Sequence, residues 1–180
     1  MTDLSPLAPA SFPALPEIPG VQLAAAACGV RYAGKLDVLL VELAEGTEVA
    51  GVFTKSQTAA APIDWCKKSL TNGKARALVV NSGNANAFNG VAGMTSVERT
   101  ATQTAKVVGC LPEDVFIAST GVIGEALPDE KITDALAGLK SELASDWQAA
   151  AEAICTTDTY PKGSFRTVKI GDTDVTIGGI

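Results

Sequence analysis

Two segments rich in hydroxyl and amide side chains each follow a short apolar run and contain glycine. Residues 81–87 (Asn-Ser-Gly-Asn-Ala-Asn-Ala) follow the run at 77–80, and residues 119–124 (Ser-Thr-Gly-Val-Ile-Gly) follow the run at 115–118. Glycine lets the backbone approach a ligand closely, and the neighbouring hydroxyls, amides and N–H groups can donate hydrogen bonds. The chain has no histidine, so a Ser-His-Asp mechanism within it is excluded. These residues suit the stabilisation of a negatively charged intermediate by hydrogen-bond donors.

Thr120 and Gly121 have the types that an oxyanion hole requires, which are two or more donors aimed at one point. The same residues also suit an ordinary turn at the end of a strand, and the sequence leaves both interpretations open. Residues 156–159 (Thr-Thr-Asp-Thr) likewise suit either a turn or the binding of a substrate amine or amide. For the asparagines of 81–87 a structural role is favoured, because asparagine side chains hold tight loops by bonding backbone groups.

Composition narrows the class of protein. A chain of 180 residues is long enough to bury a core and is expected to form one domain. Its net charge of −6 argues against nucleic acid as a partner, because phosphate binding needs a basic surface. No apolar run approaches the roughly 20 residues of a membrane span. The N-terminus has Asp3 and prolines where a signal peptide has a basic region and an apolar core, so we expect a cytoplasmic protein.

The four cysteines predict neither a metal site nor a catalytic thiol. Cys28, Cys66, Cys110 and Cys155 are far apart in the sequence, and no histidine is present to complete a zinc site. We expect reduced, mostly buried thiols. No glycine-rich phosphate-binding loop occurs, so no nucleotide cofactor is predicted.

The elements expected to position these residues alternate between strand and helix. Residues 1–19 contain five prolines and predict an extended arm over a single domain at 20–180. The runs at 38–43 and 49–54, separated by Glu45-Gly46-Thr47, predict a hairpin. Residues 63–70 predict a short helix that ends at Asn72-Gly73.

Three further helices and a second hairpin follow. One helix is predicted to begin at Thr95, which has capping-box spacing with Glu98, and to stop at Gly109. The others are predicted to begin at Pro128, a residue favoured in the first turn, and at Ser145. The alternating runs at 165–170 and 174–177 predict a hairpin. The expected fold is α/β (α+β), a mixed sheet covered by packed helices.

Five segments together resemble the ornithine acetyltransferase family, also called glutamate N-acetyltransferase or ArgJ. They occur in the family's order over residues 20–180. They are residues 50–54 with 60–62, 81–87, 119–124, 156–159 and 177–180 (Ile-Gly-Gly-Ile).

The resemblance implies a self-cleaving precursor of which this chain is the α part, with the α/β sandwich of self-processing acyl transferases. Family members cut themselves before a threonine, which becomes the nucleophile at the N-terminus of the β chain and uses its own amine as base. That chemistry fits a chain without histidine. The implied reaction is ping-pong transfer of acetyl from N-acetylornithine to glutamate in an α2β2 heterotetramer. Because the chain stops at residues 178–180, ahead of the nucleophile, we expect it to be inert alone.

The resemblance also assigns roles to residues. Thr120 and Gly121 correspond to the family's oxyanion hole, and a substrate-binding threonine falls on Thr156 or the adjacent Thr157. It implies no metal and no cofactor apart from acetyl-CoA as a possible acetyl donor. Phe88 departs from the family, which usually has cysteine there, and this departure leaves substrate preference open.

Three alternatives remain at this stage. A bifunctional member would also accept acetyl-CoA, and a related self-processing amidohydrolase would use water in place of glutamate. A non-catalytic small-molecule binding domain would be favoured if the gene had no Ala-Thr junction after Ile180.

Overall fold

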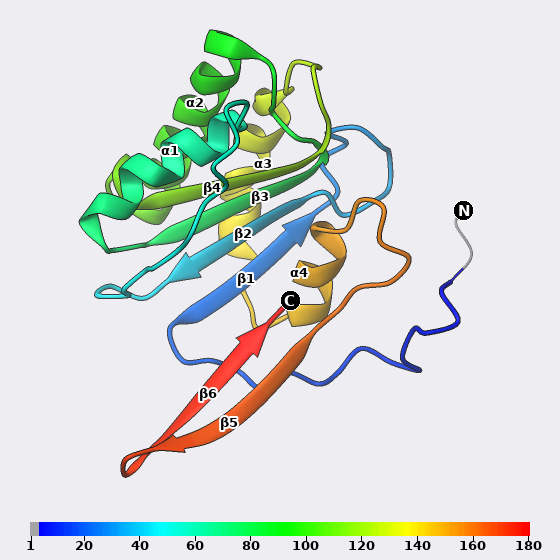
Figure 1. Cartoon of the computed structure of the whole chain (residues 1–180), viewed down its shortest axis with the longest axis vertical. Coiled ribbons are helices and arrows are strands. Elements are labelled where there is room, and N and C mark those ends of the chain that lie inside the picture. The colour runs from blue at the N-terminus through cyan, green and yellow to red at the C-terminus, as the bar shows by residue number, and fades with distance from the viewer. Residues whose placement is uncertain (1–3) are drawn as a thin grey trace.

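The centre of the molecule is a four-stranded mixed sheet (Figure 1). The structure is a computed structural model and describes residues 4–180. The strand order is β1-β2-β3-β4, in which β1 pairs with β2 and β2 with β3 antiparallel, whereas β3 and β4 are parallel. The predicted mixed sheet is confirmed. The strands are β1 (Val21–Ala26), β2 (Val38–Leu43), β3 (Ala77–Asn84) and β4 (Val115–Val122).

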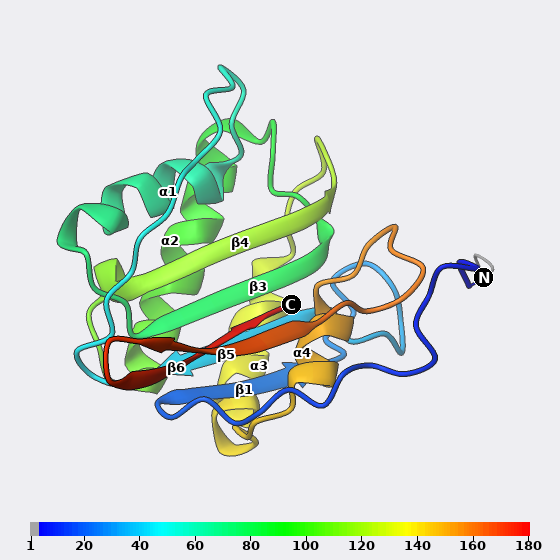
Figure 2. The same cartoon turned by 60° about the horizontal axis from the view of Figure 1, so that its bottom comes forward.

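Helices cover both faces of this sheet (Figures 1 and 2). Val38 and Leu40 of β2 pack with apolar residues of α2 and α3, whereas Leu39 and Val41 pack with alanines of α4. Because successive side chains of a strand point to opposite faces, α4 must lie on the face opposite α2 and α3. The helices are α1 (Ala61–Ser69), α2 (Gly90–Val108), α3 (Asp129–Ser141) and α4 (Trp147–Ala153).

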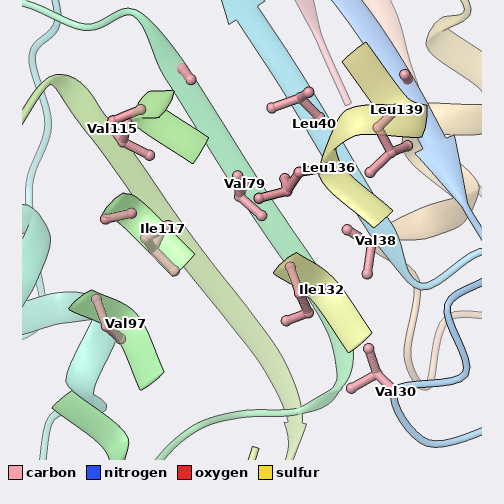
Figure 3. Packing of buried hydrophobic residues seen from close by; sticks show 14 of the residues in the cluster. Val30, Val38, Leu40, Val79, Val97, Val115, Ile117, Ile132, Leu136 and Leu139 are labelled. Atoms are coloured by element: carbon pink, nitrogen blue, oxygen red, sulfur yellow. The ribbon is translucent and has the colours of Figure 1, made fainter. Parts of the chain in front are cut away.

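The larger core cluster lies between the sheet and the α2–α3 layer. Figure 3 shows Leu136 of α3 beside Leu40 and Val79, with Ile132 and Leu139 of the same helix on either side. Each of these side chains is at most 2% exposed. Burial on both faces explains why β2 has a continuous apolar sequence in place of strict alternation.

α1 lies along the outer edge of β4. The indole N–H of Trp65 donates to the Val115 carbonyl at 2.8 Å, and the Cys66 thiol donates to the Ile117 carbonyl at 3.2 Å. The Ile117 N–H donates back to the Cys66 sulfur at 3.4 Å. These side chains form hydrogen bonds with backbone N–H and C=O groups of β4 that would otherwise be unpaired at the edge of the sheet. Residues 70–72 continue as the short 3-10 helix η1 (Leu70–Asn72), which ends at Gly73 as the sequence predicted.

The predicted hairpin of 38–43 with 49–54 is wrong. The chain does turn at Glu45-Gly46, but residues 49–54 form no strand, and only Glu48 makes an isolated bridge, with Lys74. Both edges of β2 are already paired, with β1 and β3. Apolar residues of 49–54 instead pack on the edge of the fold: Phe53 contacts the cluster around Cys66, while Val52 is 99% exposed.

The helix starts differ from the predictions at three places, and α1 begins at Ala61, ahead of the predicted residue 63. α2 begins at Gly90, ahead of Thr95, whose hydroxyl donates to the Val91 carbonyl inside the helix at 3.1 Å. The predicted stop at Gly109, which has a φ of 82°, is confirmed. α3 begins directly after Pro128, as predicted. The cap of α4 is not Ser145 but Asp146, whose carboxylate accepts the Ala149 N–H at 2.9 Å.

The second predicted hairpin is confirmed, as β5 (Ser164–Ile170) with β6 (Thr173–Gly179). It forms a sheet of its own, and every residue of β5 is exposed. Residues 4–20 contain no helix or strand, and Phe12 of this arm lies against Gly163 where β5 begins. The first three residues of the predicted arm lie outside the described residues. No helix in residues 4–180 combines the length and the apolar character needed to cross a membrane.

Candidate functional site

Two glycines join the ends of β3 and β4. In the parallel register Ser82 lies beside Thr120 and Gly83 beside Gly121, and the register shifts at Asn84. Gly121 has a φ of +136°, and a Cβ there would lie 2.3 Å from the carbonyl carbon of Gly83. Only glycine tolerates this contact and this conformation. The two donor-rich segments therefore meet backbone to backbone at one end of the sheet.

A cavity of about 320 Å³ opens at this joint. It brings together all four residues that the sequence assigned to the site: Thr120 and Gly121 from β4, and Thr156 and Thr157 from the turn after α4. The rest of its lining comes from β3, from the last residue of β4 and from the connection between β1 and β2. Those residues are Tyr32, Lys35, Asp37, Ser82, Gly83 and Val122.

The hydroxyl groups around this cavity are available to a ligand. Within residues 4–180 the hydroxyls of Ser82, Thr120, Thr156 and Thr157 make no hydrogen bond to the chain. No buried side-chain oxygen or nitrogen in that part of the chain lacks a partner, so these hydroxyls must reach solvent-accessible space. Ser82 is 1% exposed as a residue, which leaves the cavity as the space that its hydroxyl faces. Four hydroxyl groups with free donors and acceptors suit a small polar ligand.

The asparagines behind the cavity hold the loop, as predicted. Asn81 donates to the Asn84 carbonyl at 2.8 Å and accepts the Ser119 hydroxyl at 2.6 Å. Asn84 donates to the Glu125 carbonyl at 3.1 Å and accepts the Asn86 N–H at 2.8 Å. All three asparagine residues are at most 3% exposed. Because these amides are engaged within the protein, they stabilise the strand ends.

Two charged residues of the cavity wall were missed by the sequence analysis. Asp37 is 3% exposed, and its carboxylate accepts the N–H groups of Cys28 at 2.7 Å and Val30 at 2.6 Å. It thus fixes the connection between β1 and β2. The Lys35 ammonium donates to the Cys155 carbonyl at 2.6 Å. Asp37 could have been noticed in the sequence because it directly precedes the apolar run 38–43. No feature of the sequence marked Lys35 as a residue of the site.

The cysteines do not contribute a nucleophile to this cavity. Burial, and then the nearby Asp37 carboxylate, raise the pKa of Cys28 from 9.0 to about 11. Burial also raises the pKa of Cys66, Cys110 and Cys155. A thiol must lose its proton to attack, so all four are weak nucleophiles at neutral pH. They are free thiols, with Cys66 buried and the others partly exposed. No group of three cysteine, aspartate or glutamate side chains in residues 4–180 could hold a metal ion.

A second hollow, of about 420 Å³, lies where α2 begins and is lined in part by Asn86, Phe88 and Asn89. Its amides are engaged: Asn86 donates to the Gly93 carbonyl at 3.0 Å, and Asn89 donates to the Glu125 carbonyl at 2.8 Å. Phe88 adopts a left-handed conformation and is 76% exposed. The cavity at Thr120 has free hydroxyl groups, whereas the amides of the second hollow are already bonded. We therefore take the cavity at Thr120 as the candidate functional site.

Comparison with known proteins identifies relatives over nearly the whole chain. The sequence model of the ArgJ family matches residues 22–180. The arginine biosynthesis bifunctional protein ArgJ of Mesorhizobium japonicum is 54% identical over 180 residues, which cover 99% of this chain and 44% of that protein. The protein of the same name from Bradyrhizobium diazoefficiens is 53% identical with the same coverage. The chain thus spans less than half the length of these curated relatives.

Solved structures give the same result. The crystal structure of arginine biosynthesis bifunctional protein ArgJ from Bacillus halodurans is 31% identical with a TM-score of 0.84, covering 89% of this chain and 85% of that one. Ornithine acetyltransferase from Mycobacterium tuberculosis, solved with ornithine, is 35% identical with a TM-score of 0.82, covering 89% and 86%. These neighbours confirm the α/β fold with a mixed sheet and packed helices. By sequence and by structure, the chain belongs to the ArgJ family.

Proposed function

We propose that this chain is the α part of an arginine-biosynthesis acetyltransferase, which moves acetyl from N-acetylornithine to glutamate. The observation that carries the proposal is the cavity at the joined ends of β3 and β4. Thr120, Gly121, Thr156 and Thr157 all line this cavity, and within residues 4–180 the hydroxyls of the three threonines are free. The similarity to an ornithine acetyltransferase solved with ornithine supports the same substrate class.

In this mechanism the cavity stabilises two tetrahedral intermediates. A threonine hydroxyl attacks the acetyl carbonyl carbon of N-acetylornithine, and the negative charge develops on the carbonyl oxygen. The hydroxyl of Thr120 and the N–H of Gly121 donate to that oxygen. The C–N bond then breaks, ornithine leaves with the proton taken from the attacking hydroxyl, and acetyl remains as a threonine ester. The amine of glutamate attacks this ester and the same donors act again. The ester C–O bond then breaks, the threonine oxygen takes up the proton that the amine loses, and N-acetylglutamate leaves.

The attacking threonine belongs, in this proposal, to a β chain from the same precursor. Within the chain itself there is no histidine to activate a hydroxyl, and an N-terminal threonine needs none because its own amine serves as base. The lengths of the relatives support two chains. This chain covers only 44% of the curated proteins but 85% and 86% of the solved chains.

The β5–β6 hairpin is the surface that we expect the β chain to cover. A two-stranded hairpin alone is marginally stable in water. This one exposes a set of large apolar side chains, each between 37% and 63% exposed, and such patches mark interaction sites. They are Phe165, Val168, Ile170 and Ile177, together with Ile180 directly after β6. We infer an α2β2 assembly in the cytoplasm.

Replacement of Thr120 tests the proposal. The assay uses the complete protein, meaning this chain together with the portion that its full-length relatives carry beyond it. Thr120→Ala should lower turnover on the order of 10²–10³-fold, the usual cost of losing an oxyanion donor. Thr120→Ser keeps the hydroxyl and should retain most activity. Thr102→Ala, a change at an exposed position of α2, serves as the control. A Thr120→Ala protein with the unchanged rate would remove this residue from the mechanism.

Two variants of the function lead to different products. The word bifunctional in the names of the curated relatives favours a member that also takes acetyl from acetyl-CoA. In that case acetyl-CoA and glutamate alone should yield N-acetylglutamate. An amidohydrolase would instead release acetate from N-acetylornithine whether or not glutamate is present. Mass spectrometry of the β chain after incubation with N-acetylornithine should find an acetylated N-terminal threonine, and its absence would contradict the ping-pong route.

A further inference from the structure

Lys35 is the one basic side chain among the residues that line the cavity at Thr120. Within residues 4–180 its ammonium forms no ion pair with an acid. Arg31, which lies against Gly83, is by contrast paired with Glu125 at 2.5 Å. An unpaired ammonium at the wall of a polar cavity is a natural partner for an anionic group.

The position of this ammonium is fixed by the protein. Lys35 is partly buried, and its nitrogen donates to the Cys155 carbonyl at 2.6 Å. Cys155 directly precedes Thr156 and Thr157, so the bond ties Lys35 to the segment that carries the two threonines of the cavity. A lysine ammonium has three N–H donors. One is used by the carbonyl, and the others are available to a ligand.

The acid of the cavity wall does not compete for this charge. Each carboxylate oxygen of Asp37 already accepts a short backbone N–H bond, from Cys28 and Val30. The chain as a whole carries a net charge of −6, so a local cation is needed to favour a substrate carboxylate. Lys35 supplies that cation at the cavity.

We propose that Lys35 is a specificity-determining residue that binds the carboxylate of the amino-acid substrate. The proposal rests on the proposed function and deepens it. Ornithine derivatives and glutamate share an α-carboxylate beside the nitrogen that gains or loses acetyl. One ammonium at a fixed place can therefore orient the donor in the first half-reaction and the acceptor in the second, with the reacting nitrogen facing the hydroxyl of Thr120.

The test compares substrates with and without the carboxylate in the complete protein. Lys35→Met should raise the KM for N-acetylornithine about 10- to 100-fold, the usual range for a charge-assisted contact. The KM for the α-carboxamide of N-acetylornithine should change less than about threefold, and kcat should change little for either. Lys35→Arg should restore much of the loss because it keeps the charge. Lys162→Met is the matched control, since Lys162 pairs with Asp158 in the same segment and does not line the cavity.

An equal rise in KM for both substrates would overturn the proposal, because it would mean that Lys35 only holds the turn at Cys155. An unchanged KM for N-acetylornithine would overturn it as well. If the unmodified protein transfers no acetyl group, the proposed function fails, and calorimetry still tests Lys35. Ornithine should then bind more tightly than ornithinamide, and Lys35→Met should abolish the difference. Equal binding of the two by the unmodified protein would refute the assignment.

Discussion

Replacing Gly121 with alanine should damage both stability and activity, because a Cβ there meets backbone and not a movable side chain. The added carbon would lie 2.3 Å from the Gly83 carbonyl carbon and 2.5 Å from the Asn84 nitrogen. A φ of +136° costs a residue with a side chain about 1–3 kcal/mol. Relieving the overlap by moving the strands apart costs a further 1–3 kcal/mol or so. The expected loss is about 2–6 kcal/mol, a large share of the 5–15 kcal/mol or so that stabilises a typical domain.

Urea unfolding of the complete protein, followed by circular dichroism, measures this loss. Gly138→Ala is the matched control, because Gly138 lies within α3 and a Cβ there meets no atom within 4 Å. That change should stabilise the protein by about 0.5–1 kcal/mol, since alanine favours a helix over glycine. Turnover should fall in Gly121→Ala, because the displaced strand carries Thr120, and should hold in Gly138→Ala. Equal unfolding midpoints for the two variants would refute the close approach of β3 and β4.

Three further predictions concern other contacts. Ser119→Ala should cost about 1–3 kcal/mol in urea unfolding, because the buried amide oxygen of Asn81 loses the hydroxyl that donates to it at 2.6 Å. Arg99→Met should lower the unfolding free energy by about 2–3 kcal/mol in the same assay, because the buried Asp129 carboxylate loses both guanidinium bonds, at 2.6 and 2.7 Å. Cys28 should react with iodoacetamide at pH 8 about 100-fold more slowly than an unperturbed thiol, measured by peptide mass spectrometry, because its pKa rises from 9.0 to about 11. The same rise means that its contribution to stability is complete below pH 9 and is lost as the pH approaches 11, because the unfolded thiol ionises first.

Local patterns were enough to predict most of the strands and several of the helix ends. The runs at 77–80 and 115–118 are apolar because both faces of those strands are covered, and each is followed by the residues of the cavity edge. Glycine at the end of α2 and proline before α3 act through their own backbone conformations. Such signals are local, so one sequence suffices to read them.

Pairing between distant segments could not be predicted in the same way. Residues 49–54 have the sequence of a second hairpin strand, but the strand that would pair with them is already bonded to β1 and β3. The start of α2 was missed for a related reason. The loop before it is held by Asn86 and Asn89, whose bonds reach Gly93 and Glu125 and not a cap of the helix. Bonds of this kind depend on the tertiary structure.

The register of the sheet explains why the charged wall of the cavity comes from a part of the chain with no motif. β3 and β4 are parallel, so their carboxyl ends, with Ser82 and Thr120, lie at one edge. β2 is antiparallel to β3, with Val38 opposite Asn81, so the amino end of β2 must lie at that same edge. The Ser82 N–H donates to the Asp37 carbonyl at 2.9 Å and fixes this junction. Lys35 reaches the cavity because it lies two residues before Asp37. Knowledge of the strand order would therefore also have placed this cation in the same cavity as Thr120 and Gly121.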